Sequence, residues 1–174
     1  MKMKNSNELQ VVSIRLVDDP PWKGKESLCT PEKVVEFLSE ELSKYDRELL
    51  CILNMSTKAQ VINMNIVSIG TLNKSIVEPR ELFKSAILSN SASIIIVHNH
   101  PSGIAIPSRE DILITQRLCA CGELLGIPVI DHIIIGGKGE FYSMRKENTF
   151  PKVNNESIVA NGVLKEEMEA EIKI

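Results

Sequence analysis

The most reactive combination of residues in this chain is a pair of histidines, His98 and His100, separated by one residue. They follow residues 94–97, a β-branched run that is typical of a buried strand. Because side chains alternate along a strand, the two imidazoles point to the same side at its end. Pro101 comes next and cannot donate a hydrogen bond to a neighbouring strand, so the strand ends there.

An aspartate follows the histidines at the start of a predicted helix. Pro107 and Ser108 are typical of a helix start, and Asp111 lies one turn inside it, where its carboxylate can turn back toward the histidines. Two neutral imidazoles and one carboxylate make a three-ligand zinc site with a fourth position open for water. Structural zinc normally has four protein ligands, so this pattern predicts catalytic zinc. Zinc lowers the pKa of its bound water to about 7, which makes hydroxide available at neutral pH.

Each of these features also has a simpler explanation. A single histidine here would more often be a polar residue that closes a strand, and Ser108 with Asp111 could be a capping box. The third histidine, His132, precedes three isoleucines and is better explained as a satisfied histidine in the core or at its rim. The metal site is favoured because all but one of the 3 histidines stand in one pair just before a helix that carries an aspartate.

A hydrolytic site of this kind also needs a general base, and a nearby carboxylate is the usual one. Spacing alone leaves four glutamates open: Glu48, Glu78, Glu81 and Glu110. Glu110 faces away from Asp111 on the same helical turn, which weakens it as a candidate.

The composition indicates an ordinary globular domain. The chain has 174 residues, 43% of them hydrophobic and 25% charged, which suits one domain with a real core. A net charge of −3 and an aromatic content of 4% do not support a surface that tracks phosphates or stacks bases. The sequence shows no secretory signal and no apolar run near the ~20 residues needed to span a bilayer. The 4 cysteines contain no C-x-x-C pair, so we expect reduced thiols and a cytoplasmic protein without a membrane partner.

Apolar periodicity and turn residues predict an α/β domain with a mixed sheet between helices. Residues 1–29 are expected to form an N-terminal extension with an edge strand at 9–17, residues 30–145 the domain, and residues 146–174 a loosely attached polar and acidic tail. The predicted helices begin at Thr30-Pro31, Glu78-Pro79 and Ser108, the last ending at Gly126; the predicted strands cover 49–53, 61–69, 94–100, 129–135 and 141–144. The second helix is expected to turn Leu82, Phe83, Ala86 and Ile87 inward, and the third Ile114, Leu118, Cys121 and Leu125.

The motif H-N-H-P-S-G-x4-P-S-x-x-D resembles the JAMM motif of JAB/MPN metallopeptidase domains, in the form found in RadC-type proteins. The similarity extends from about residue 30 to residue 144 and includes Glu78-Pro79-Arg80-Glu81-Leu82-Phe83 and Asp131-His132-Ile133-Ile134-Ile135-Gly136. This resemblance implies an α/β sandwich similar to that of cytidine deaminases.

The resemblance also assigns roles. The residues that match the family's zinc ligands are His98, His100 and Asp111, while Ser108 matches the residue that stabilises the oxyanion and Glu48 the catalytic glutamate. It implies a zinc-dependent hydrolase that cleaves peptide or isopeptide bonds in a polypeptide or other amide substrate. The alternatives are a non-catalytic protein-interaction module and a RadC-like role linked to DNA repair. A zinc deaminase is disfavoured because it needs H-x-E and P-C-x-x-C, and Cys119-Ala120-Cys121 has the wrong spacing.

Two features differ from the usual pattern of the family. RadC-type proteins often carry a helix-hairpin-helix region before this domain, whereas 29 residues precede the first predicted helix here, so we expect only weak DNA binding. The loop after the histidines reads Ile104-Ala105-Ile106, where polar residues are usual. These isoleucines either fold back onto the core or form an apolar lip that contacts a polypeptide substrate or a second subunit in a homodimer.

Overall fold

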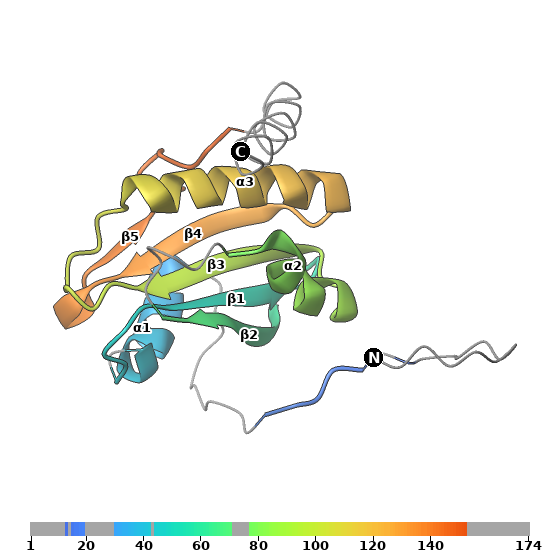
Figure 1. The fold of residues 1–174 in the computed structure, drawn as a ribbon, viewed down its shortest axis with the longest axis horizontal. Coiled ribbons are helices and arrows are strands. Elements are labelled where there is room, and N and C mark those ends of the chain that lie inside the picture. Colours follow the sequence, from blue (N-terminus) through green and yellow to red (C-terminus); the bar gives the residue numbers. More distant parts are fainter. Residues whose placement is uncertain (1–12, 14, 20–29, 43, 71–76, 153–174) are drawn as a thin grey trace, which may run out of the picture.

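The computed structural model of this chain describes residues 13, 15–19, 30–42, 44–70 and 77–152. Three α-helices and a sheet of five strands make up this part (Figure 1). In chain order the elements are α1 (Pro31–Leu42), β1 (Leu49–Met55), β2 (Val61–Ile69), α2 (Pro79–Leu88), β3 (Ser93–Asn99), α3 (Arg109–Leu125), β4 (Val129–Ile135), the 3-10 turn η1 (Gly137–Gly139) and β5 (Phe141–Ser143).

The sheet is mixed, with the strand order β2-β1-β3-β4-β5. β1 is antiparallel to both β2 and β3, and β5 is antiparallel to β4. β3 and β4 are parallel, so the chain must cross from one end of the sheet to the other between them, and α3 makes that crossing. The predicted α/β architecture is confirmed.

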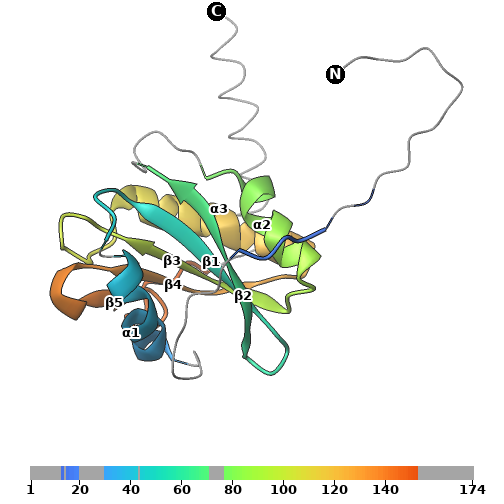
Figure 2. The same ribbon diagram turned by 90° about the horizontal axis from the view of Figure 1, so that it is seen from below.

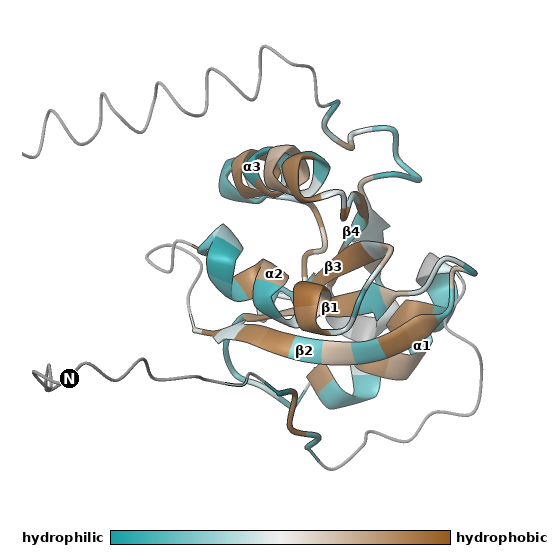
Figure 3. Cartoon of the chain, turned by 90° about the vertical axis from the view of Figure 1, so that its right-hand side faces the viewer, coloured by the Kyte–Doolittle hydropathy of each residue, from teal (hydrophilic) through white to brown (hydrophobic). Residues whose placement is uncertain are grey.

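The helices cover both faces of the sheet. Figures 1 to 3 show α1 on one face and α2 and α3 on the other. All seven residues of β1 are buried and six of them are apolar, with Asn54 as the exception, so the strand reads as a nearly continuous apolar run rather than an alternating one. Its odd-numbered side chains pack against α1, in a cluster that includes Val34, Leu38, Leu49, Cys51 and Leu53.

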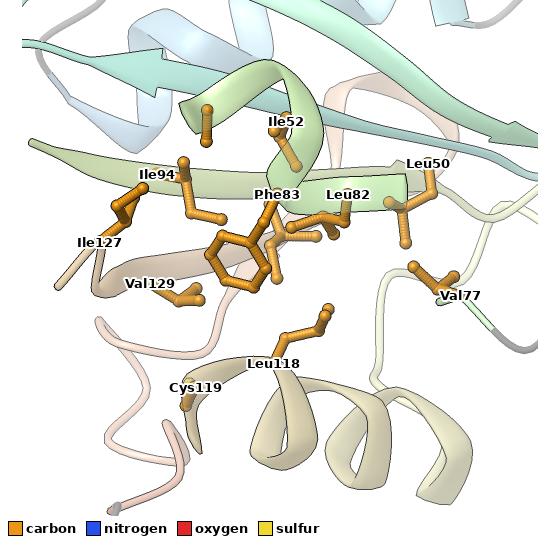
Figure 4. Close-up of a cluster of buried hydrophobic side chains, with 12 residues drawn as sticks. Leu50, Ile52, Val77, Leu82, Phe83, Ile94, Leu118, Cys119, Ile127 and Val129 are labelled. Carbon is orange, nitrogen blue, oxygen red and sulfur yellow. The ribbon is translucent and has the colours of Figure 1, made fainter. Parts of the chain in front are cut away.

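The even-numbered side chains of β1 pack toward α2 and α3. Phe83 of α2 lies at the centre of this second cluster, near Ile94 and Val129 of the sheet and Leu118 of α3 (Figure 4). Figure 3 shows β1 and β3 as mainly hydrophobic, whereas the helices carry both hydrophobic and hydrophilic residues. Helices therefore pack against both faces of the sheet at β1 and β3.

The predicted helix boundaries are confirmed, and two predicted core residues are wrong. The α1 N-cap, Thr30, accepts a hydrogen bond at Oγ1 from the Lys33 amide at 3.3 Å, and α3 ends at Gly126 with a left-handed φ of 68°. Ile87, however, is 52% exposed because Leu82, Phe83 and Ala86 already fill the face of α2 that meets the sheet. Leu125 is 47% exposed because it is the last residue of α3.

The predicted terminal segments lie largely outside the described residues. Of the edge strand expected at 9–17, residues 13 and 15–17 are described, and they form neither helix nor strand. Of the tail expected at 146–174, residues 146–152 are described, and Phe150 among them packs partly buried against the α2–α3 cluster. Among the described cysteines, Cys51, Cys119 and Cys121 are free thiols. In this part of the chain no helix combines the length and the apolar character needed to cross a membrane.

The two-sided packing predicts how α3 responds to truncation. Leu118 is fully buried between α2 and the sheet, whereas Leu124 on the same helix is 69% exposed. We expect Leu118→Ala to lower the free energy of unfolding by about 2–5 kcal/mol through lost burial and a residual cavity. The matched variant Leu124→Ala should change it by less than about 0.5 kcal/mol. Chemical denaturation of both variants measures this, and equal losses would contradict the packing described for α3.

Candidate metal centre

The two histidines are held at the end of β3, between two neighbouring strands. His98 is fully buried, and it pairs with Leu50 of β1 on one side and Ile134 of β4 on the other. His100 lies just beyond the strand, and its backbone amide donates to the carbonyl of Ile135 at 2.8 Å. The sheet therefore fixes the backbone on both sides of the H-x-H pair, and both imidazoles leave it on the same face, as predicted.

Asp111 reaches the same point from the start of α3. Its amide donates to Oγ of the N-cap Ser108 at 3.1 Å, and its own Oδ2 accepts from the Ser108 amide at 2.7 Å. This reciprocal pair is the capping box that served as the simpler explanation of these residues. The capping box and a ligand role coexist, because Oδ1 of the same carboxylate lies 3.3 Å from Nε2 of His98.

The three side chains form a compact triangle of donor atoms. Nε2 of His98 and Nε2 of His100 are 2.9 Å apart, and Nε2 of His100 is 3.5 Å from Oδ2 of Asp111. Two ligands of a tetrahedral zinc ion at about 2.0–2.1 Å would be separated by roughly 3.3 Å. The observed separations are close to that value, so His98, His100 and Asp111 could hold a small divalent ion.

The other nitrogen of each imidazole is already bonded. Nδ1 of His100 lies 2.7 Å from the carbonyl oxygen of Ile104, which can only accept, so Nδ1 carries the hydrogen and Nε2 of the neutral ring carries a lone pair. Nδ1 of His98 lies 2.8 Å from Nε2 of His132. Both rings are thus oriented by the protein so that their Nε2 atoms converge.

The electrostatic environment keeps the buried rings neutral and the carboxylate charged. Burial lowers the pKa of His98 well below its usual range and that of His132 to about 4. Burial works to raise the pKa of Asp111, but its hydrogen bonds with His100 and Ser108 and the nearby His98 outweigh it, and the pKa lies below its ordinary value. The hydrogen bond to Asp111 is in turn the main cause of a raised pKa at His100.

Of the four glutamates left open by the sequence, Glu48 lies beside the histidines. Extending the antiparallel register of Leu50 with His98 by two residues places Glu48 opposite His100, and its charge adds to the raised pKa of that ring. By contrast, Glu81 is exposed and paired with Lys84, and Glu78 is paired with Arg117; Glu110 is exposed.

Asn99, which the sequence analysis missed, holds the backbone on both sides of Glu48. Its side chain is buried, Oδ1 accepts from the Leu49 amide at 2.8 Å, and Nδ2 donates to the carbonyl of Arg47 at 3.2 Å. The middle residue of the H-x-H pair therefore ties the start of β1 to the end of β3. It points to the face opposite the two histidines, as alternation along the strand requires.

Ser108 is exposed, and its hydroxyl is engaged in this state. Oγ donates to Oδ2 of Asp111 at 2.6 Å while accepting from the Asp111 amide. The Ser108 amide also donates to that Oδ2, so the carboxylate keeps one hydrogen bond if the hydroxyl turns toward another acceptor. A role for Ser108 in stabilising an oxyanion stays a prediction.

The chain is similar to known proteins over most of the described residues. The RadC-like JAB domain family matches residues 28–149. The chain belongs to this family. A UPF0758 protein of Desulforamulus reducens is 52% identical over 127 residues, covering 73% of this chain and 56% of that protein. A UPF0758 protein of Methanosarcina acetivorans is 48% identical over 123 residues, covering 71% of this chain and 53% of that protein. A UPF0758 protein of Bacillus cereus is 45% identical over 126 residues, covering 72% of this chain and 56% of that protein. The chain thus spans about half the length of the curated relatives it matches.

In this RadC-like JAB domain, the loop after His100 is held against the turn that follows β4. The Gly137 amide donates to the carbonyl of Gly103 at 2.8 Å, and Gly103 has a φ of 83°, which favours glycine. A Cβ on Gly136 would lie 2.6 Å from the Gly103 carbonyl oxygen and 3.0 Å from the Ala105 amide. This close approach holds the Ile104 carbonyl where it meets His100.

The same loop exposes two isoleucines. Ile104 and Ile106 are 59% and 68% exposed, so the alternative that they fold back onto the core is wrong; Ala105 between them is the buried residue. They face an open hollow of about 440 Å³, which Phe141 and Tyr142 of β5 also line. We call Ile104 and Ile106 the apolar lip.

His132 and Thr115 are further members of the site that the sequence analysis did not place there. His132 is fully buried, which confirms its prediction as a core or rim histidine, yet it contacts His98 directly. Thr115, also fully buried, lies one turn after Asp111 on α3, with Oγ1 at 2.5 Å from Nδ1 of His132. The Asp111-to-Thr115 spacing of four residues is the signal that could have placed both on one face of the helix.

The contact between the loop and the glycine turn predicts an effect on cation binding. Gly136 has an ordinary extended backbone, with φ of −97°, so Gly136→Ala acts only through its new Cβ. We expect it to displace the loop, to misplace the Ile104 carbonyl, and to weaken Zn²⁺ binding roughly tenfold or more in competition titrations.

Gly122→Ala is the matched control. A Cβ on Gly122 of α3 would lie equally close to a carbonyl oxygen, 2.6 Å from that of Ile127. Ile127 belongs to the turn between α3 and β4 and not to the loop after His100. This variant should lower the melting temperature and leave Zn²⁺ affinity unchanged. Equal Zn²⁺ affinity in the Gly136→Ala variant and the unmodified protein would show that the loop does not orient His100.

Proposed function

We propose that this RadC-like JAB domain is a zinc-dependent hydrolase that cleaves peptide or isopeptide bonds, a metallopeptidase of the JAMM type. The observation that carries the proposal is the convergence of Nε2 of His98, Nε2 of His100 and the Asp111 carboxylate within 2.9–3.5 Å. Two imidazole lone pairs aimed at each other repel unless a proton or a cation lies between them. The adjacent carboxylate favours a cation there.

The donor set supports zinc as the ion. Imidazole nitrogens suit zinc and other transition metals, whereas magnesium and calcium prefer oxygen ligands. Three protein ligands leave one position open, which is the arrangement of catalytic rather than structural zinc sites. Membership of the RadC-like JAB family supports the same choice.

Zinc bound here would supply a Lewis acid for the scissile carbonyl and a water that ionises near neutral pH. The residues of the chain perform the remaining tasks. Glu48, beside His100, accepts a proton from the attacking water and later donates one to the leaving amine. Ser108 turns its hydroxyl from Asp111 to the negative charge that develops on the carbonyl oxygen, while the Ser108 amide keeps Asp111 in place.

The substrate that we propose is a polypeptide that crosses the apolar lip. Ile104 belongs both to the lip and to the site, because its carbonyl accepts from His100 at 2.7 Å while its side chain is exposed. An apolar side chain of the substrate could lie in the hollow between the lip and β5. A second subunit could cover the same surface, so a homodimer is the other occupant to be tested.

Two other functions have less support. A non-catalytic interaction module would not need a complete set of ligands with a carboxylate beside it. A DNA-linked role, which the family's RadC name suggests, would favour a basic surface, but the net charge is −3. We expect DNA binding that is weak and falls steeply with salt.

Metal analysis coupled to a peptide-library cleavage assay tests the main proposal. The purified protein should hold about one zinc per chain and cleave a subset of peptides. Glu48→Gln keeps the shape of the side chain but removes the proton acceptor, so zinc should stay and turnover should fall by roughly 10²-fold or more. The His98→Ala, His100→Ala double variant should lose both zinc and activity.

Glu81→Gln serves as the control, because Glu81 pairs with Lys84 on the surface of α2. It should keep full activity. If Glu81→Gln removes cleavage and Glu48→Gln does not, the assignment of the general base is wrong. Full zinc content without any cleavage would favour the interaction module, and iron in place of zinc would indicate a different chemistry.

The apolar lip gives a separate prediction. In an Ile104→Ser, Ile106→Ser variant we expect unchanged zinc content and melting temperature, because both side chains are exposed. The KM for a cleaved peptide should rise, since burying one such side chain on binding contributes about 1.5–3 kcal/mol before ordering costs. Light scattering of the same variant tests the homodimer. An unchanged KM and an unchanged molecular mass would show that the apolar lip contacts neither the substrate nor a second subunit.

A further inference from the structure

A series of hydrogen-bonded buried groups runs from α3 along the face of the sheet that α3 covers and ends at the candidate metal ligand His98. Oγ1 of Thr115 donates to the backbone carbonyl of Asp111, and Nδ1 of His132 lies 2.5 Å from the same Oγ1. Nε2 of His132 then lies 2.8 Å from Nδ1 of His98. Thr115, His132 and His98 are each fully buried, so protein groups must satisfy all of their polar atoms.

The direction of every hydrogen bond in this series follows from the Asp111 carbonyl at which the series begins. A carbonyl oxygen only accepts, so the single hydrogen of the Thr115 hydroxyl points to Asp111. Oγ1 can then only accept from His132, which places the hydrogen of that ring on Nδ1. The Nε2 lone pair of His132 therefore accepts from Nδ1–H of His98.

These directions leave His98 in one defined tautomer. With its hydrogen on Nδ1, the neutral ring presents the lone pair of Nε2 to His100 and Asp111. In the other tautomer, an Nε2–H group would occupy the position of the ion. Both ring nitrogens of His132 contact neutral groups, which disfavours a charged His132 ring. A charged ring would donate from Nε2 to His98 and so reverse the direction of that hydrogen bond.

We propose that His132 and Thr115 are positioning residues that fix His98 in the tautomer able to bind the metal. This inference rests on the proposed metal site, but it concerns residues that would not touch the ion. α3 supplies both ends of the arrangement, because Asp111 and Thr115 are four residues apart on the face that meets the sheet. One helix thereby sets the position of the carboxylate and the protonation of the imidazole opposite it.

Zn²⁺ titration of the full chain with hydroxyl and ring variants tests the proposal. Thr115→Val keeps the shape but removes the acceptor for His132, and His132→Phe removes both bonds of the ring; each should weaken Zn²⁺ binding by roughly 10–100-fold. Thr115→Ser keeps the hydroxyl and should bind within about threefold of the unmodified protein. His132→Gln can place an amide oxygen near the position of Nε2, so it should recover most of the affinity that His132→Phe loses.

Ring ¹⁵N NMR of the metal-free protein provides a readout that loss of stability alone would not change. The His98 ring should carry its hydrogen on Nδ1 in the unmodified protein, and a population with hydrogen on Nε2 should appear in Thr115→Val. Ser85→Ala is the control, because Ser85 is a buried hydroxyl near Asn54, at the opposite end of β1 from Leu50 and His98. It should change neither the Zn²⁺ affinity nor the His98 tautomer.

The outcomes separate this inference from the proposed function. If the unmodified protein binds no Zn²⁺, the proposed function fails, while the His98 tautomer still tests the hydrogen-bond chain. If the unmodified protein binds Zn²⁺ and folded Thr115→Val and His132→Phe variants bind it equally well, the proposed role of His132 and Thr115 is overturned. Hydrogen on Nε2 of His98 in the metal-free unmodified protein would overturn it as well.

Discussion

The complete burial of His98 is the constraint on which the described domain depends. An imidazole has two nitrogens, and a fully buried ring needs a partner for each because an unsatisfied polar group destabilises the fold. Nδ1 meets His132 of β4, which lies beside β3 in parallel, and a parallel pairing requires a crossover, which α3 makes. Nε2 meets His100 and the carboxylate at the start of that same α3. The topology and the polar contacts of one side chain therefore depend on each other.

Asp111 joins the stability of the helix to the candidate site. A carboxylate in the first turn is favoured by the partial positive charge of a helix N-terminus, and the capping box satisfies amides that otherwise lack a partner. The two oxygens divide the work, since Oδ2 accepts from Ser108 while Oδ1 faces His98. The hydrogen bonds of the capping box restrict the rotation of the Asp111 carboxylate, so the same bonds that begin the helix hold it rigidly beside the two histidines.

The sequence predicted most of the fold and the three candidate ligands because the information for both is local. The ends of β3 and the start of α3 follow from Pro101 and from the Pro107-Ser108 pair. Spacing alone left four glutamates open, and the family resemblance selected Glu48. Its place beside the histidines depends on the pairing of β1 with β3, which joins residues about fifty positions apart and which spacing cannot give. Asn99 was missed for the same reason, since its partners Arg47 and Leu49 are distant in the chain.

His132 shows where local reasoning reaches its limit. Its place in an apolar strand predicted burial, and the structure confirms it, but a buried histidine and a histidine that orients a ligand look the same in a sequence. The difference lies in the parallel register that pairs Ile96 with His132 and so places His132 beside His98 on the face covered by α3. A register between two strands joined by a long helix depends on the packing of the whole layer. Ile87 was placed wrongly for a related reason, because periodicity gave the apolar side of α2 but not its width.

The candidate site is closed on one side and open on the other, and this asymmetry bears on how a substrate would reach it. Behind the three candidate ligands lie the buried His132 and Thr115, whose polar side-chain atoms contact each other, His98 and the Asp111 carbonyl. In front lie the exposed Ser108 and the apolar lip, with His100 between the two sides. The buried side therefore cannot distinguish one substrate from another, because it has no surface that a substrate can touch. For the hydrolase that we propose, selectivity belongs to the loop at 102–106 and to the edge of β5, while the ligands and the residues behind them perform the same chemistry on whatever that loop admits.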